Sequence, residues 1–326
     1  MTEELVLGFA AIVVLGIAAQ WIAWRLKVPS ILLLLLLGLG AGPLTGLIEP
    51  DRLMGGMLRP FVSLAVAVIL FEGGLSLKVS ELRATGAAVH RLLTVGAVVT
   101  WALSAASAYY ILGLELQMSV LLGAILVVTG PTVVTPLLRH IRPSERVASV
   151  LRWEGILIDP LGAALAVLVY EAILAGRFQQ VSEIAAEVIF KTVVTGGFFG
   201  VTAAFMLVLL LKKYWVPDYL ENPVTLMLVV LSYTLSNLYQ TESGLLAVTF
   251  MGATLANQKT VPVKHIMEFK ENLTVLLISF LFVILAARIR PDDLARVNLS
   301  TVLFLGSLVL AVRPVSVFIS MIGSGL

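Results

Sequence analysis

Two carboxylates, Glu154 and Asp159, lie inside one of the most apolar stretches of the sequence, within RWEGILIDPLG at 152–162. A charged side chain at the centre of a bilayer is costly, so an acid there indicates a function in binding an ion or a proton. Gly155, Asp159 and Gly162 share one helical face, and the glycines leave room for a neighbouring helix or an ion. We therefore expect Asp159 to be the ion site; an acid with only a structural hydrogen bond is the alternative.

Glu154 points to a different neighbour from Asp159, because it lies on another face of the same helix. A structural role is the better interpretation, and it requires a cation. Arg313, in VLAVRPVSVF, is the best-placed candidate inside an apolar segment. Arg288, at the end of LFVILAARIR, is expected to reach the outer interface by extending its charged end toward water.

The segment before the acidic helix, MSVLLGAILVVTGPTVVTPLL, contains Gly130, Pro131 and Thr132 near its middle. Proline lacks a backbone N–H and disfavours helical geometry in the preceding residue, so the helix should open around Thr129 and Gly130. Carbonyls freed at membrane depth must be satisfied by neighbours or must line a watery cavity. A proline kink tolerated by packing is the alternative. Glu72 is a third acid, either near the site or at the membrane interface.

The composition indicates the solvent in which these residues work. Hydrophobic residues make up 59% of the 326-residue chain and charged residues 13%, with a mean hydropathy of +1.02. These values are typical of an integral membrane protein. A spanning helix needs about 20 apolar residues, which predicts an all-α polytopic protein with about 11 transmembrane helices. The segments are 5–24, 30–48, 60–77, 88–113, 118–138, 147–175, 189–211, 222–239, 243–257, 272–289 and 299–322.

Basic residues in the loops predict the orientation. With the N-terminus outside, thirteen Lys and Arg residues fall in inner loops and six in outer loops. The net charge of +2 gives no reason to expect a nucleic-acid partner, and the absence of cysteine excludes disulfides and thiol catalysis. No nucleotide loop, metal-ligand cluster or hydrolytic triad is evident. We expect no cofactor and no enzymatic activity.

Four motifs together resemble the monovalent cation/proton antiporters of the sodium/hydrogen exchanger superfamily, and its NhaP-like branch more than the NhaA type. They are LFEGGLSL at 70–77, VVTGPTVVTPLLRH at 127–140, RWEGILIDP at 152–160 and VRPVSVF at 312–318. The resemblance implies the NhaA/NhaP-like fold of two inverted repeats, in a homodimer whose core helices move against a dimerisation scaffold. It also implies that Asp159 binds cation and proton alternately, with oxygens from Thr129 and Glu72, while Glu154 and Arg313 hold the core together.

The sequence departs from the family pattern at three positions near the site. Gly130 replaces the usual aspartate, Ile158 the usual asparagine, and Gly155 a frequent serine, so more of the coordination is left to water. We expect residues 1–177 to form the first repeat with helices 1–6, 178–212 a linker helix, and 213–326 an incomplete second repeat. The last of these suggests a C-terminally truncated chain.

These features predict a secondary active transporter that exchanges Na⁺ or K⁺ for H⁺ by competition at the buried Asp159. Because position 158 is apolar, we expect electroneutral one-for-one exchange. The protein is expected to be a multi-pass homodimer in the lipid bilayer of the cell (inner) membrane. A cation channel and a non-transporting truncated membrane subunit are the alternatives.

Overall fold

The computed structural model describes residues 2–130, 134, 137–138, 141–176, 178, 181–262, 264–295 and 297–322. The described chain is helical and contains no β-strand, as the apolar runs predict. The helices are α1 (Thr2–Leu26), α2 (Ser30–Leu39), α3 (Pro50–Met54), α4 (Leu58–Leu75), α5 (Val79–Arg91), α6 (Ala97–Leu112), α7 (Leu116–Ile125), α9 (Glu145–Leu174), α10 (Val181–Lys212), α11 (Glu221–Tyr239), α12 (Ser243–Asn257), α13 (Lys264–Ala287), α14 (Pro291–Ala295), α15 (Leu299–Ser307) and α16 (Arg313–Met321).

Several of these helices have the length and composition of membrane spans. Six stretches of the described chain qualify: Leu5–Leu26, Pro50–Leu75, Thr85–Leu112, Glu145–Leu174, Ala185–Lys212 and Leu299–Met321. Four apolar helices are shorter: Ser30–Leu44, Leu116–Ile125, Ser243–Asn257 and Asn272–Ala287. Together with α11 they overlap all the expected segments. Because α11 is less apolar and four helices are short, eleven membrane crossings stays a prediction.

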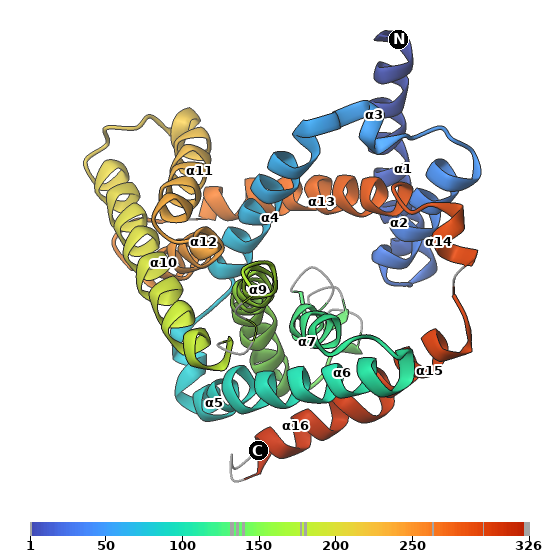
Figure 1. Cartoon of the computed structure of the whole chain (residues 1–326). Helices are drawn as coiled ribbons and strands as arrows, with labels where there is room; N and C mark the ends of the chain where they lie inside the picture. Colours follow the sequence, from blue (N-terminus) through green and yellow to red (C-terminus); the bar gives the residue numbers. More distant parts are fainter. Residues whose placement is uncertain are drawn as a thin grey trace.

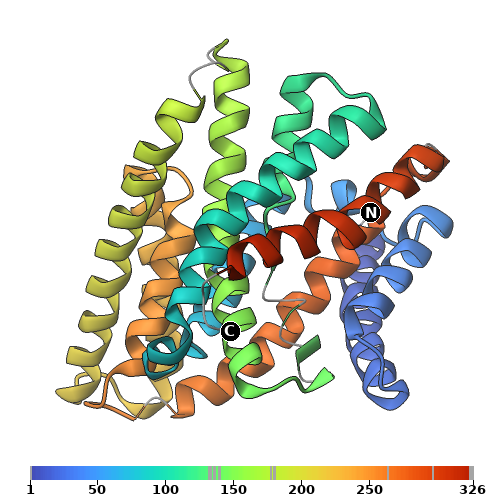
Figure 2. The same cartoon turned by 90° about the horizontal axis from the view of Figure 1, so that it is seen from below.

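The helices pack as two groups that meet mainly at α9 (Figure 1). The α12 group consists of α1, α2, α4, α10, α11, α12 and α13, and the α9 group of α5, α6, α7, α9, α15 and α16. Contacts of α9 with α4, α10 and α12 join the two groups. Figure 2 shows α15 and α16 crossing beside α6, a packing that the contacts also record. The helix that carries Asp159 therefore lies at the boundary between the groups.

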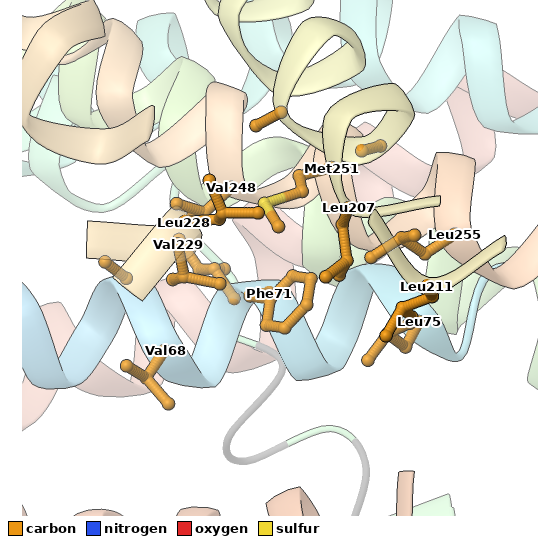
Figure 3. Close-up of a cluster of buried hydrophobic side chains, with 14 residues drawn as sticks. Val68, Phe71, Leu75, Leu207, Leu211, Leu228, Val229, Val248, Met251 and Leu255 are labelled. Carbon is orange, nitrogen blue, oxygen red and sulfur yellow. The ribbon is translucent and has the colours of Figure 1, made fainter. Parts of the chain in front are cut away.

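A cluster of buried apolar side chains holds the α12 group together (Figure 3). Phe71 of α4, Leu207 of α10 and Met251 of α12 interdigitate there, each at most 1% exposed. Small residues permit the helices to approach: a Cβ on Gly252 would collide with the carbonyl of Phe71. Such close contacts through glycine are typical of helix packing in membranes.

Three π-helical segments occur in the described part of the chain. They are η1 (Gly40–Leu44), η3 (Leu92–Gly96) between α5 and α6, and η6 (Leu308–Val312) between α15 and α16. The second and third lie in the same part of the molecule, because α16 packs against η3 and η6 contacts α6. A π-helical turn shifts the facing of the residues that follow it, and such turns are frequent at functional sites. Arg313 comes directly after η6.

Candidate ion-binding site

The helix before α9 opens a few residues ahead of its glycine and proline. The α-helical part of α7 ends at Ile125, a turn follows at Leu126 and Val127, and residues 128–130 are not helical. The sequence predicts an opening around Thr129 and Gly130. In the structure the opening begins a few residues earlier. Pro131 and Thr132, the other two residues of the expected break, lie outside the described residues.

The non-helical segment lies against the face of α9 that carries Asp159. A Cβ on Gly155 would be 3.2 Å from the carbonyl oxygen of Thr129, and a Cβ on Gly162 would be 2.5 Å from Val128 Cγ2. Asp159 lies between these two glycines on the same face. Because neither glycine has a side chain, the opened backbone approaches α9 closely on both sides of the acid.

Oxygen atoms gather on this face of α9. The Thr129 carbonyl lies beside Gly155. The Thr129 hydroxyl oxygen, Oγ1, is buried. Within the part of the chain that the structure describes, this oxygen has no hydrogen-bond partner. Asp159 itself is half-buried, as is Glu72 on α4. The turn of α4 that carries Glu72 touches α9, because a Cβ on Gly73 would be 3.4 Å from Ile156 Cγ1.

Glu154 and Arg313 form an ion pair across the α9 group. Arg313 Nη2 lies 2.5 Å from Glu154 Oε1, and the side chains are 34% and 3% exposed, respectively. The pair joins α9 to α16, whose first residue is Arg313. A carboxylate this deeply buried requires a compensating charge, which Arg313 supplies. Glu154 is therefore engaged in structure, whereas Asp159 faces the opened backbone.

Four polar contacts near the site or its helices were not anticipated from the sequence. Glu81 of α5 accepts a hydrogen bond from Ser149 (2.8 Å) and lies 3.8 Å from Arg152, both on α9. The side chain of Asn257, at the end of α12, makes hydrogen bonds to the backbone of the α4–α5 junction. The spacing of residues along the sequence does not predict such contacts, because each contact joins segments far apart in the chain.

Two further polar sites lie on α11 and at the end of α13. Arg288 Nε lies 3.0 Å from Asp51 Oδ1, with both side chains half or more exposed, and its reach toward the outer interface stays a prediction. Two polar residues of α11 contact α12, whereas Thr234 donates to a carbonyl of its own helix. Ser236 bonds Ser243 at 2.7 Å, and Asn237 accepts from the backbone N–H of Gly244.

A transported cation would find few protein ligands here. Within the described ranges, no cluster of three or more histidine, aspartate or glutamate side chains is present. One acid beside freed backbone and hydroxyl oxygens suits a weakly held monovalent cation that keeps part of its water shell. An interrupted helix next to a membrane-embedded acid is the arrangement of ion-coupled secondary transporters.

The chain belongs to the family described as sodium/hydrogen exchanger, transmembrane, whose sequence profile matches residues 9–326. It is 31% identical to Na(+)/H(+) antiporter 1 of Methanocaldococcus jannaschii, over 98% of this chain and 76% of that protein. It is 28% identical to the K(+)/H(+) antiporter NhaP of Alkalimonas amylolytica, over 97% of this chain. The chain spans 55% of the length of that second relative.

A solved structure has the same fold. The sodium proton antiporter MjNhaP1 from M. jannaschii at pH 8 superimposes with a TM-score of 0.80 at 26% identity, covering 99% of this chain and 80% of that one. The expected resemblance to NhaP-type transporters is thereby confirmed, and the family is one of membrane transporters rather than enzymes.

Proposed function

We propose that this protein exchanges Na⁺ or K⁺ for H⁺ at Asp159. The observation that supports this most directly is the contact of the Gly155–Asp159–Gly162 face with the opened backbone at 128–130. The similar proteins are named for both cations, one as a Na(+)/H(+) and another as a K(+)/H(+) antiporter. Thr129 supplies an oxygen to the cation, Glu72 a supporting oxygen, and water completes the coordination.

Exchange follows from competition for one carboxylate. Burial disfavours the charged form of Asp159, and either a proton or a bound cation removes that penalty. The two ligands therefore exclude each other. If only the neutral, loaded forms pass between the inward-open and outward-open states, each cation moved one way requires a proton moved the other way. Ile158 beside Asp159 offers no second acid, which makes the exchange electroneutral.

The passage between states is a movement of the α9 group against the α12 group. The two groups meet mainly through α9, so a displacement of α9 relative to α4, α10 and α12 carries Asp159 with it. Glu154 and Arg313 lie within the α9 group and keep α9 and α16 together during that movement. Residues 1–177 form the first repeat and residues 213–326 the incomplete second repeat. The linker between them is 178–212, most of which is α10.

We place the protein in the cell membrane, which is the inner membrane in a cell that has two membranes. Its N-terminus lies on the outer side of that membrane. The support is the basic loop residues that fall at the opposite end of the spans, among them Arg25, Lys27, Lys78, Lys212 and Lys213. We also propose a homodimer, with the α12 group as its scaffold. Cross-linking in native membranes tests the dimer, and labelling of cysteines introduced near residue 5 tests the orientation.

The test of function is Asp159→Asn in proteoliposomes. Asparagine keeps the size of the side chain and removes its titration, so we expect loss of cation-driven proton flux with no change in thermal unfolding. Ser307→Ala, far along the sequence on α15, serves as a control that should keep full flux. Persistent cation-driven proton flux in the asparagine variant would remove Asp159 from its role.

A passive cation channel is the second candidate, because an interrupted helix and a buried acid also line pores. The same vesicles separate the two. An imposed proton gradient should drive Na⁺ or K⁺ uphill through an antiporter. A channel would instead give cation flux that is independent of the proton gradient and carries a current.

A further inference from the structure

Asn257, the last residue of α12, holds the junction between α4 and α5. Its Oδ1 accepts a hydrogen bond from the backbone N–H of Val79 at 2.8 Å. Its Nδ2 donates to the carbonyls of Leu77 (2.8 Å) and Ala253 (2.7 Å). Two of these bonds join segments almost 180 residues apart in the chain, so the amide bridges two elements rather than closing a local turn.

The bonded backbone groups lie where the chain passes from one helix group to the other. α4 belongs to the α12 group and α5 to the α9 group, and Leu77 and Val79 flank Lys78, the residue before α5. The Lys78 side chain makes no capping bond to α5. Because the first N–H groups of a helix have no partner within it, Asn257 supplies from α12 the cap that the junction lacks.

Packing around the junction joins α4, α9 and α12. The Leu77 side chain is 1% exposed and lies in a cluster with Trp153 and Ile156 of α9, against which Ala253 of α12 also packs. The neighbouring turn of α4 is equally close: a Cβ on Gly74 would collide with backbone atoms of α12 around Thr249. The junction is therefore one of the places where the two helix groups are connected.

We propose that Asn257 is a positioning residue, which pins the α4–α5 junction as the pivot about which the α9 group moves during exchange. The inference rests on the proposed function, because a pivot has meaning only if the groups move. Displacing the junction from α12 would leave a backbone donor and acceptor without partners and would disturb the buried Leu77. Among the described residues, no side-chain hydrogen bond joins the far end of α9, near Leu174, to the α12 group, so rotation about this junction costs less than translation of it.

The kinetic test compares two neighbouring amides. Asn257→Ala should lower the maximal exchange rate about fivefold, because it loosens the pivot, and should leave the apparent KM for the cation unchanged. Gln258→Ala is the matched control. Gln258 makes three bonds, all within its own loop, to Thr260 and Val261. Equal rates in the two variants, or a changed KM with an unchanged maximal rate in Asn257→Ala, would overturn the proposal.

The chain has no cysteine, so spin labels at introduced cysteines give a second readout that does not depend on transport. One pair, Val79→Cys with Gln258→Cys, spans the pivot and leaves Asn257 in place. The other, Glu171→Cys with Tyr239→Cys, joins α9 to α11. Between pH 5 without Na⁺ and pH 8 with Na⁺, we expect the first distance to stay constant and the second to change.

The outcomes separate the two proposals. A pivot distance that changes along with the second distance overturns the pivot and leaves exchange at Asp159 intact. Two constant distances overturn the pivot as well, because no movement accompanies ion binding. Failure of the proposed function has its own signature, which is proton flux that Asp159→Asn does not alter.

Discussion

Glu154 and Asp159 lie little more than one turn apart on α9, yet their surroundings give them different chemistry. Glu154 is fully buried against Arg313, and a paired buried charge has little freedom to bind anything else. Asp159 lies between two glycines on the face of α9 that meets the opened backbone, and no ion pair of Asp159 is seen among the described residues. We infer that the first acid stabilises the fold and the second binds the transported ions.

Arg313→Ala tests the structural half of that inference. It leaves Glu154 buried without its cation, and we expect a loss of about 2 kcal/mol in unfolding free energy, measured by thermal or denaturant unfolding in detergent. Arg288→Ala is the matched control, because its pair with Asp51 is solvent-exposed and should contribute less than about 1 kcal/mol. Equal losses of unfolding free energy in the two variants would show that the burial of Glu154 does not determine how much its ion pair with Arg313 stabilises the protein.

Glu242, in the turn before α12, offers a prediction about pH. Burial raises the pKa of its carboxyl above the ordinary value, and the nearby Glu171 raises it further. The folded protein therefore favours the protonated form, so stability is full below the unfolded pKa and is lost as pH rises through the raised value. Glu242→Gln should unfold at a higher temperature than the parent at pH 8 and at the same temperature at pH 4. A difference that is constant with pH would contradict this assignment.

At the scale of elements, the break in α7 and the long α9 form a single unit. The opened backbone can lie close to α9 only because positions 155 and 162 are glycine. This juxtaposition follows from the sequence, since Gly–Pro at the middle of an apolar segment and small residues beside an acid are both visible in a single chain. The residue at which α7 ends does not follow, because the last hydrogen bonds of a helix depend on what surrounds it.

Gly155→Val tests that contact. A Cβ would lie 3.2 Å from the Thr129 carbonyl oxygen, and the branched methyl groups require still more space. We expect the variant to fold but to lose at least tenfold in exchange rate, because the oxygen is displaced from Asp159. Gly306→Val on α15 is the control, since no atom lies within 4 Å of its Cβ position and exchange should persist. Normal exchange in Gly155→Val would mean that the Thr129 carbonyl has no part in the site.

Other features of the elements could not be predicted from the sequence. The apolar runs that mark 88–113 and 299–322 as helices continue through η3 and η6 without a sign of the π-helical turns. The pairing of Arg313 with Glu154 is predictable, because a buried acid requires a cation and few basic residues occur inside apolar segments. Asn257 had no such signal: an asparagine at the end of a helix usually serves its own turn, and here it bonds a junction brought to it by the packing of α4 on α12.

On the scale of the whole molecule, two helix groups meet mainly along α9, the helix that carries Asp159. One apolar cluster joins α4, α10, α11 and α12, and another joins α7 and α9, with Ala185 and Val188 of α10 packed against it. Groups with cores of their own can move as units, and an interface made mainly by one helix is the place where such movement costs least. If the groups move as proposed, Asp159 moves with the α9 group relative to the α12 group.

The central claim is that cation and proton compete for Asp159. It is tested most directly by measuring Na⁺- or K⁺-driven exchange in proteoliposomes as a function of cation concentration at several pH values. Competition predicts that, toward acid pH, the apparent KM for the cation rises about tenfold for each pH unit while the maximal rate stays constant. A maximal rate that falls with pH at constant KM would mean that proton and cation occupy different sites, which would contradict exchange at a single carboxylate.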